Sequence, residues 1–304
     1  MNLYKIKNKK LLYIEEVGFK TEYEIQRLCE ENIKELFDLE LVCSQFIIQK
    51  FRIDTLAFDE KIKSFVIIEY KKDENFSVVD QGYTYLSLVL NNKAECILVY
   101  NEKKGKQLKK QDVDWSQTKV IFVAPSFTSY QIQSINFKDL PIELWEIKKY
   151  ENNLVVLKQI EVTPAKESIK IISKKSKIAE RVNKEIKVYT EEEHLARAPK
   201  GIKELYGKFK TAVLSLGSEI KIKPTKWYIA FVSKTNFTDV EIRRKKLKIY
   251  LNLRKGELED PRNIARDVST IGHWGNGDYQ IYFNNEQDLD YIMSLVKQSY
   301  NKNS

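Results

Sequence analysis

Two carboxylates and a lysine stand close together in the segment RIDTLAFDEKIKSFVIIEYKK, residues 52–72. Asp54 lies in the first of two apolar runs, and Glu69 and Lys71 end the second. Residues two apart on a strand share a face, so Glu69 and Lys71 project to the same side. If a turn at residues 59–63 joins the runs as a hairpin, Asp54 comes alongside Glu69.

Such a group of side chains suits the chemistry of phosphodiester cleavage. Carboxylates that converge on an apolar strand repel each other unless a cation is present. Mg²⁺ takes oxygen ligands, keeps several waters and completes its shell with substrate phosphate. Lys71 would then orient the attacking water or stabilise the developing charge. The alternative is a buried salt bridge of Lys71 with Asp54 or Glu69 that has no catalytic role.

Alternating helical and strand patterns surround these residues. Helical spacing predicts a helix over residues 21–37, and apolar runs predict three strands, at 41–51, 52–58 and 64–70. Further along, the patterns predict a helix at 81–90, strands buried on both faces at 95–100 and 119–124, a helix at 127–135 and a strand at 142–148. This alternation indicates an α/β sheet domain over residues 1–160.

The rest of the chain is predicted to form a second domain that follows a linker. Residues 161–194 are rich in Lys, Glu and Ser and predict a charged linker. Helices at 202–216 and 287–300, with strands that include 227–232 and 247–253, predict an α+β domain over residues 195–304. The glycine-rich GHWGNGDY segment, residues 272–279, favours a turn over a ligand site.

Composition narrows the class of protein. The 304 residues include 52 Lys and Arg against 43 Asp and Glu, a formal charge of +9, which suits a polyanionic partner but also an ordinary solvated surface. Only His194 and His273 are present, and the three cysteines form no CxxC pair, so no zinc site is indicated. No apolar run is long enough for a membrane span, and we expect a cytoplasmic protein without a membrane partner.

The order of motifs resembles the PD-(D/E)XK nuclease superfamily, and most closely its NucS-like endonuclease domains, over residues 15–150. There a helix acid is followed by RxD or GxxD, then ExK, then QxxxY. The matching residues are Glu22 or Glu24 in TEYEIQ, Arg52 and Asp54 in RID, Glu69 and Lys71 in EYK, and Gln81 and Tyr85 in QGYTY. No proline precedes Asp54 here, a departure that removes no ligand.

The resemblance implies a restriction-endonuclease-like α/β fold, a mixed sheet flanked by helices, for the first domain. It implies a DNA endonuclease in defence, restriction or repair, with homodimerisation as one option. Asp54, Glu69, the Tyr70 carbonyl and Glu22 would be the ligands of Mg²⁺ or Mn²⁺, and Lys71 the catalytic lysine. A catalytically silent nucleic-acid- or partner-binding protein on the same scaffold is the alternative.

The roles of the remaining motif residues stay more open. Gln81 and Tyr85 are four residues apart on one helix face, from which they can act in the site, although Tyr85 also suits plain core packing. Arg52 is expected to contact a phosphate or to cap the carboxylates. Glu22 shares a helix face with Gln26, which favours it over Glu24, but either acid also suits a solvated face.

The second domain also resembles a known type, a domain of unknown function found at the end of nuclease-like bacterial proteins and sometimes labelled a predicted transport protein. The resemblance rests on LARAPKGIKELYGKF, DVSTIGHWGNGDYQIYF and LDYIMSLVKQSY. A basic run within it is expected to bind nucleic acid: Arg243, Arg244, Lys245 and Lys246, with Lys248 beside them. The alternative for this run is a solvated strand edge protected by lysines.

Overall fold

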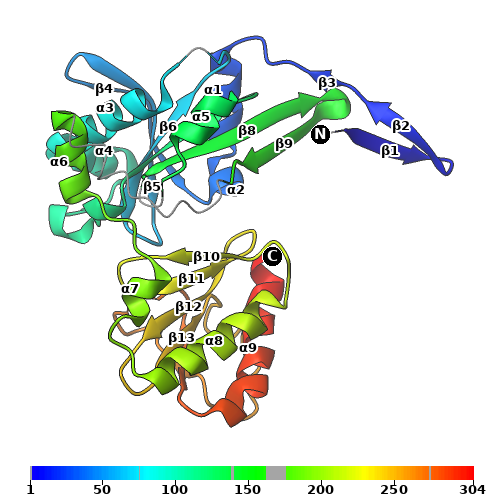
Figure 1. Ribbon diagram of the computed structural model, residues 1–304, viewed down its shortest axis with the longest axis vertical. Helices are drawn as coiled ribbons and strands as arrows, with labels where there is room; N and C mark the ends of the chain where they lie inside the picture. The colour runs from blue at the N-terminus through cyan, green and yellow to red at the C-terminus, as the bar shows by residue number, and fades with distance from the viewer. Residues whose placement is uncertain (1, 75, 138–139, 162–175, 274) are drawn as a thin grey trace. The chain divides into compact units, whose positions relative to one another are not determined.

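The computed structural model describes residues 2–74, 76–137, 140–161, 176–273 and 275–304. The chain divides into two compact units, Met1–Val188 and Tyr189–Ser304, shown in Figure 1. Each unit has its own sheet and its own hydrophobic core, so each is described separately.

The first unit is built on a seven-stranded mixed sheet with the strand order β3-β8-β7-β6-β5-β4, in which β9 also pairs with β8. The β6–β7 and β7–β8 pairs are parallel, and the other pairs are antiparallel. The strands are β3 Glu16–Val17, β4 Glu40–Ile48, β5 Phe51–Asp59, β6 Ser64–Tyr70, β7 Lys119–Ala124, β8 Ile142–Tyr150 and β9 Leu154–Gln159.

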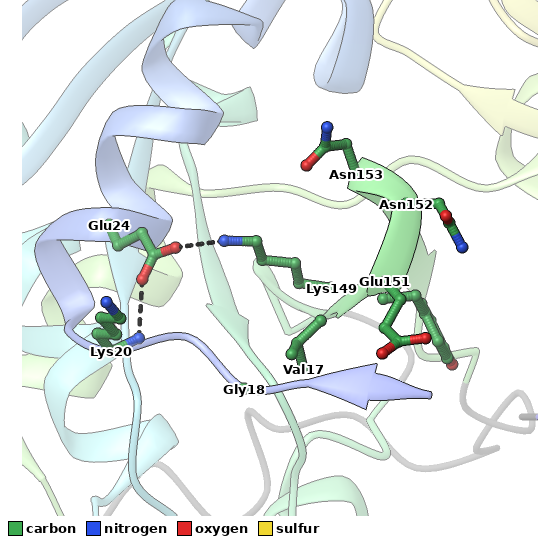
Figure 2. A pocket seen from close by; sticks show the side chains of 9 residues that line it. Val17, Gly18, Lys20, Glu24, Lys149, Glu151, Asn152 and Asn153 are labelled. Carbon is green, nitrogen blue, oxygen red and sulfur yellow. Dashed lines mark hydrogen bonds and ion pairs between the residues drawn. The ribbon is translucent and has the colours of Figure 1, made fainter. Parts of the chain in front are cut away.

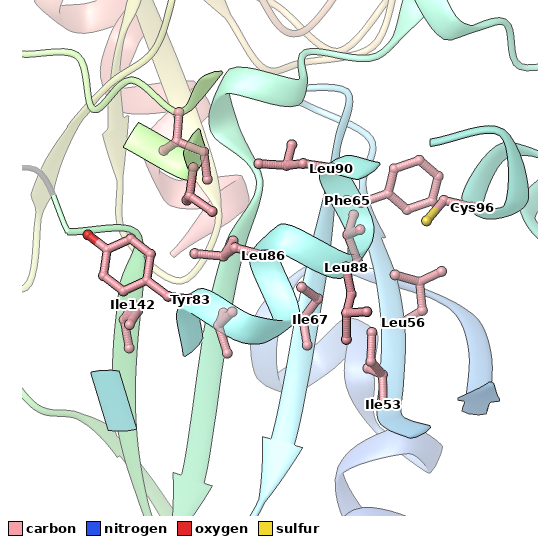
Figure 3. Close-up of a cluster of buried hydrophobic side chains, with 14 of the residues drawn as sticks. Ile53, Leu56, Phe65, Ile67, Tyr83, Leu86, Leu88, Leu90, Cys96 and Ile142 are labelled. Atoms are coloured by element: carbon pink, nitrogen blue, oxygen red, sulfur yellow. The ribbon is translucent and has the colours of Figure 1, made fainter. Parts of the chain in front are cut away.

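Helices cover both faces of this sheet because its central strands are apolar on both sides. Alternate residues of β6 separate into two clusters: Phe65 and Ile67 pack with α3 and α4, whereas Ile68 and Tyr70 pack with α1. Figure 3 shows the cluster beneath α3. The helices of the unit are α1 Glu22–Glu31, α2 Ile33–Phe37, α3 Val78–Asn91, α4 Lys93–Lys104, α5 Ser129–Ser134 and α6 Lys177–Glu185.

The fold class predicted from the sequence is confirmed: a mixed sheet flanked by helices precedes an α+β unit. The helix predicted at 21–37 breaks at Asn32 into α1 and α2. The strand predicted at 95–100 is wrong, because these residues belong to α4. Only Cys96 and Tyr100, one helical turn apart, are buried there, and Leu98 is 59 % exposed, so the apolar run is one face of a helix and not a buried strand.

The sequence patterns did not predict β3, β9 or an N-terminal hairpin in this unit. An N-terminal hairpin pairs β1 Leu3–Lys7 with β2 Lys10–Ile14 as a separate two-stranded sheet. Within the predicted charged linker, residues 162–175 lie outside the described residues, and α6 packs into the core of the first unit through Ala179 and Val182.

The second unit is a six-stranded antiparallel sheet in the order β10-β11-β12-β13-β15-β14, covered on one face by α8 and α9 (Figure 1). Its strands are β10 Lys221–Pro224, β11 Ile229–Val232, β12 Asn236–Ile242, β13 Leu247–Leu251, β14 Arg266–Asp267 and β15 Tyr279–Phe283. Its helices are α7 Glu191–Leu195, α8 Lys200–Leu214 and α9 Leu289–Asn303. In the part of the chain that the structure describes, no helix is long and apolar enough to cross a membrane.

Close packing of α3 on β8 depends on a glycine. A Cβ atom at Gly82 would lie 2.4 Å from Cδ1 of Ile142, which is closer than real contacts allow. We expect Gly82→Ala to lower the free energy of unfolding by about 1–3 kcal/mol, because the added methyl group overpacks this contact. Urea or thermal denaturation followed by circular dichroism measures the effect.

Two companion variants make this test specific. Ile142→Val removes the clashing methyl group and should restore part of the stability of the Gly82→Ala protein. Gly207→Ala, in α8, is the control, because a Cβ there meets nothing within 4 Å, and it should be neutral or stabilising by up to about 1 kcal/mol. Equal stability of the Gly82→Ala and unsubstituted proteins would contradict the packing argument.

Candidate functional site

Asp54 and Glu69 meet where β5 and β6 separate. The paired register of the two strands ends at Thr55 and Ile68. Beyond it, the Tyr70 N–H donates to Asp54 Oδ2 at 3.1 Å. The aspartate side chain thus accepts from an N–H group at the end of the ladder, and this bond fixes its carboxylate beside β6.

Glu69 lies almost fully buried, with 4 % of its surface exposed. Its Oε1 accepts hydrogen bonds from Lys71 Nζ at 2.8 Å and from the Tyr85 hydroxyl at 2.9 Å. Its Oε2 is buried and has no hydrogen-bond partner among the described residues. A buried carboxylate oxygen without a donor is costly, so this atom is suited to a positively charged ligand.

The electrostatics of the two acids agree with such a ligand. Burial raises the pKa of Glu69 above its usual range, and the charge of Asp54 raises it further. Burial likewise raises the pKa of Asp54, against the effect of the Tyr70 N–H. Burial and the Glu69 carboxylate raise the pKa of Tyr85, so its hydroxyl stays a donor at neutral pH.

Helix α1 places Glu22, rather than Glu24, beside the carboxylates. Glu22 Oε1 accepts from the Lys72 N–H at 3.2 Å, and the charge of Glu22 raises the pKa of Asp54. Glu24 instead accepts from Lys149 Nζ at 2.8 Å and from the Lys20 N–H at 2.8 Å (Figure 2). It lines a separate hollow of 470 Å³.

Two glutamines behind Asp54 complete its surroundings. Gln26 Nε2 donates to the Asp54 carbonyl oxygen at 3.0 Å. Gln45 Nε2 donates to Gln26 Oε1 at 2.8 Å and reaches Asp54 Oδ1 at 3.5 Å. Gln45 has a φ of 52°, a left-handed conformation that is uncommon for a residue other than glycine. The shared helix face of Glu22 and Gln26 was a signal in the sequence, whereas none pointed to Gln45.

The other residues predicted for this site differ in how closely they approach it. Tyr85 contacts Glu69 directly. Arg52 is exposed, and its charge opposes only a small part of the rise in the pKa of Tyr85 that burial and the nearby carboxylates cause. Gln81 has a buried Oε1 without a hydrogen-bond partner among the described residues. Asp54, Glu69, Lys71 and Tyr85 therefore form the compact part of the site.

A divalent cation fits the donor set, although the protein ligands are few. Among the described residues, no three His, Cys, Asp or Glu side chains are grouped as a metal site. Mg²⁺ needs only one or two carboxylates because water and phosphate supply the rest of its shell. The Asp54–Glu69 repulsion and the bare Glu69 Oε2 are the features that such an ion would relieve. Glu22 as a ligand stays a prediction.

The basic run of the second unit lies at the turn between β12 and β13. Arg243, Arg244 and Lys245 are exposed there, and Arg243 Nε donates to Glu241 Oε2 at 2.8 Å. The basic run and the acidic site belong to different units. Nucleic-acid binding by the basic run stays a prediction.

The glycine-rich segment that follows β14 is stabilised by turn contacts. Both ring nitrogens of His273 face carbonyl oxygens of the same segment, those of Ile271 and Gly277. Gly277 has a φ of 83° and approaches the Leu251 backbone closely, as a turn requires. Trp274 lies outside the described residues.

The sequence is similar, over nearly its whole length, to that of a bacterial relative. An uncharacterized protein from Haemophilus influenzae is 49 % identical over 299 residues, which cover 98 % of this chain and 99 % of the relative. The chain belongs to the family of that protein. Within this family member, residues 191–303 match the model of a domain of unknown function, DUF5655.

Solved structures give a weaker likeness. EndoMS in a complex with double-stranded DNA aligns with 43 % of this family member and 47 % of its own chain, at 18 % identity and a TM-score of 0.26. A repair endonuclease from Pyrococcus abyssi aligns with 40 % and 45 % of the two chains, at 19 % identity and a TM-score of 0.25. SfsA of Pyrococcus furiosus in complex with Ca²⁺ aligns with 53 % and 76 %, at 12 % identity and a TM-score of 0.27. The match spans about half the length of the first two proteins.

Glu69 should make stability depend on pH in a definite direction. Its folded-state pKa lies above the ordinary value of 4.5, so ionising it costs folding free energy. This cost is absent at low pH, where both folded and unfolded states bind the proton, and it develops as the pH rises through the raised pKa. In metal-free protein, Glu69→Gln should therefore raise Tm at pH 8, and have little effect below about pH 4.

Thermal denaturation across this pH range, with EDTA present, measures the difference between the two proteins. Glu102→Gln is a matched control, since Glu102 is exposed on α4, and its effect should vary little with pH. A Glu69→Gln protein that is less stable than the unsubstituted chain at pH 8, and equally stable at low pH, would show that the ion pair with Lys71 outweighs the burial of the carboxylate.

Proposed function

We propose that this protein is a metal-dependent phosphodiesterase, a DNA endonuclease whose active site contains Asp54, Glu69 and Lys71. The observation that carries the proposal is the arrangement of Glu69. One oxygen of this buried carboxylate binds Lys71 and Tyr85, and the other has no donor among the described residues while Asp54 repels it. A salt bridge with a purely structural role would be expected to satisfy both oxygens.

The carboxylates of Asp54 and Glu69, the Tyr70 carbonyl and Glu22 are the groups that would hold Mg²⁺ or Mn²⁺. Such an ion supplies a Lewis acid that makes water more acidic and offsets charge on the scissile phosphate. The Tyr70 N–H keeps the Asp54 carboxylate in place, Gln45 Nε2 lies 3.5 Å from its Oδ1, and Gln26 Nε2 donates to the Asp54 carbonyl oxygen. The chain thus fixes the ligand oxygens before substrate arrives, which lowers the cost of ordering them.

Lys71 is the group that would act on the substrate. Its Nζ is fixed by Glu69 Oε1 at 2.8 Å and lies 5.9 Å from the centre of the Phe76 ring. From there its N–H donors can orient the attacking water or contact a phosphate oxygen. Tyr85 keeps its proton, and it holds Glu69 by donating to it. Arg52, exposed nearby, would contact a neighbouring phosphate.

Cleavage of plasmid DNA, linear single-stranded DNA and RNA with Mg²⁺ or Mn²⁺ tests the activity. We expect cutting of DNA that EDTA abolishes, and a loss of at least about 10²-fold in rate with Lys71→Ala, because a donor aimed at developing charge contributes this much. Lys72→Ala is the matched control: it removes the same charge from the next, exposed residue and should keep the activity.

Each outcome of this assay separates the candidate functions. Cutting that persists in Lys71→Ala at the Lys72→Ala rate would exclude the proposed role of Lys71. Binding of nucleic acid without cutting under any metal condition would favour the silent binding protein. The observation that favours this second function is the Lys71–Glu69 ion pair, which would then be a structural contact alone.

Metal binding can be measured without any substrate. Ions that bind only the folded state stabilise it by mass action, so Tm should rise as Mg²⁺ or Mn²⁺ is titrated. Glu69→Gln should abolish most of this rise, because it neutralises the carboxylate that has an unbonded oxygen. Glu24→Gln should retain it, because Glu24 is engaged with Lys149 and Lys20 instead. An equal rise in all three proteins would place the ion elsewhere.

A further inference from the structure

The sheet of the second unit has two unlike faces. Val240, Ile249 and Ile281 point into the core beneath α8 and α9. Because side chains alternate along a strand, the residues before and after them lie on the opposite face. That face is polar: it carries Asp239, Glu241, Lys248, Tyr250, Gln280 and Tyr282.

The pairing of the strands surrounds Tyr282 with cations. Lys248 of β13 is directly opposite Tyr282 of β15, and Arg266 of β14 is opposite Gln280, two residues earlier. Lys246 precedes β13, and its Nζ lies 3.3 Å from the centre of the Tyr282 ring. We refer to Lys246, Lys248, Arg266 and Tyr282 as the Tyr282 patch.

The electrostatics of the patch favour an anion. Contact with the Gln280 side chain and the charges of Lys246, Lys248 and Arg266 lower the pKa of Tyr282, which is 43 % exposed. Three positive charges therefore act on one accessible phenol. Such a concentration of like charge on a solvent-facing surface is unfavourable without a counter-ion.

The two buried acids on this face do not neutralise the whole patch. Asp239 accepts from Asn236 Nδ2 at 2.8 Å and from the Asn276 N–H at 2.6 Å. Glu241 is buried, and it accepts from Arg243 Nε at 2.8 Å and from the Tyr250 hydroxyl at 3.0 Å. Lys248 Nζ is 3.8 Å from its carboxylate. Arg243 and Lys248 are the cations that Glu241 engages, whereas Lys246 and Arg266 flank Tyr282 at the surface.

We propose that the Tyr282 patch binds the phosphate groups of a nucleic-acid strand. Lysine and arginine are the usual donors to phosphate oxygens, and a tyrosine hydroxyl adds a neutral donor. The patch extends over β13, β15 and β14, or about 10 Å at the ordinary strand spacing, which is wider than a single phosphate. The choice of nucleic acid over another polyanion rests on the proposed nuclease function of the first unit.

The basic run predicted from the sequence is thereby redefined. Arg243 is bonded to Glu241 and supports the sheet. Lys246 belongs to the patch, and exposed Arg244 and Lys245 continue the positive surface beyond it at the β12–β13 turn. Lys248, Arg266 and Tyr282 join it from three strands, two of them far from the run in sequence.

Anisotropy of a labelled single-stranded DNA, titrated with the full chain in EDTA, tests the proposal. Lys246→Gln with Arg266→Gln removes two charges from the patch. Lys203→Gln with Lys297→Gln removes two from exposed positions on α8 and α9. We expect the patch variant to raise Kd about tenfold at low salt and to reduce the slope of log K against log salt by about 1.4, or 0.7 for each phosphate contact. The helix variant should keep both values.

Three results would overturn the proposal. Equal weakening by both double variants would mean that only net charge matters, and unchanged binding by the patch variant would place the strand elsewhere. The third result is that inorganic phosphate or a mononucleotide displaces the labelled DNA at the same concentration as unlabelled DNA does. That result would mean that the patch is a site for small anions. Tyr282→Phe keeps the ring and the charges, so weaker binding by this variant would support a hydroxyl contact in a folded patch, and unchanged binding would remove Tyr282 from it.

Cleavage is no part of this readout, which keeps the two proposals separable. A chain that binds through the patch but cuts nothing would retain this inference and lose the proposed nuclease. A chain that cuts DNA but binds it equally well without the patch charges would retain the proposed nuclease and lose this inference.

Discussion

The repulsion between Asp54, within β5, and Glu69, near the end of β6, is the constraint on which the first unit's candidate site depends. Water screens the two carboxylates poorly there, so burial and the like charge both raise the pKa of Glu69. The Tyr70 N–H, the Lys71 ammonium and the Tyr85 hydroxyl offset part of this cost by donating to the carboxylates. Glu69 Oε2 is the oxygen left without a donor among the described residues, and it is the atom that the proposed cation would contact.

The hydrophobic core holds this unfavourable arrangement in place. A slip of β6 by one residue would exchange its two faces and move Glu69 away from Tyr85, at the cost of moving Phe65 and Ile67 out of the cluster under α3 and α4 and into the opposite one. Helix α3, which carries Tyr85, packs closely on the sheet because Gly82 has no side chain. The position of the polar groups is therefore a consequence of apolar packing around them.

A buried acid in the second unit shows what a structural carboxylate looks like in the same chain. Both oxygens of Glu241 are bonded, one to the Tyr250 hydroxyl and the other to Arg243. Its role is to anchor cations on a sheet face, whereas Glu69 keeps one oxygen unbonded. Glu69 and Glu241 are similarly buried, and they differ in whether both carboxylate oxygens have hydrogen-bond partners among the described residues.

The sequence by itself determined the fold class, most elements and the pairing of Asp54 with Glu69 and Lys71, because strand alternation and a short turn leave little freedom over twenty residues. It misassigned residues 95–100, since a five-residue apolar run does not distinguish a buried strand from one face of a helix. For Glu22 over Glu24, the tertiary structure agrees with the helix face that Glu22 shares with Gln26. Only the tertiary structure brought Gln45 behind Asp54 and gathered Arg266 and Tyr282 around Lys246. These contacts join residues distant in sequence, and their geometry follows from how the elements pack and not from local spacing.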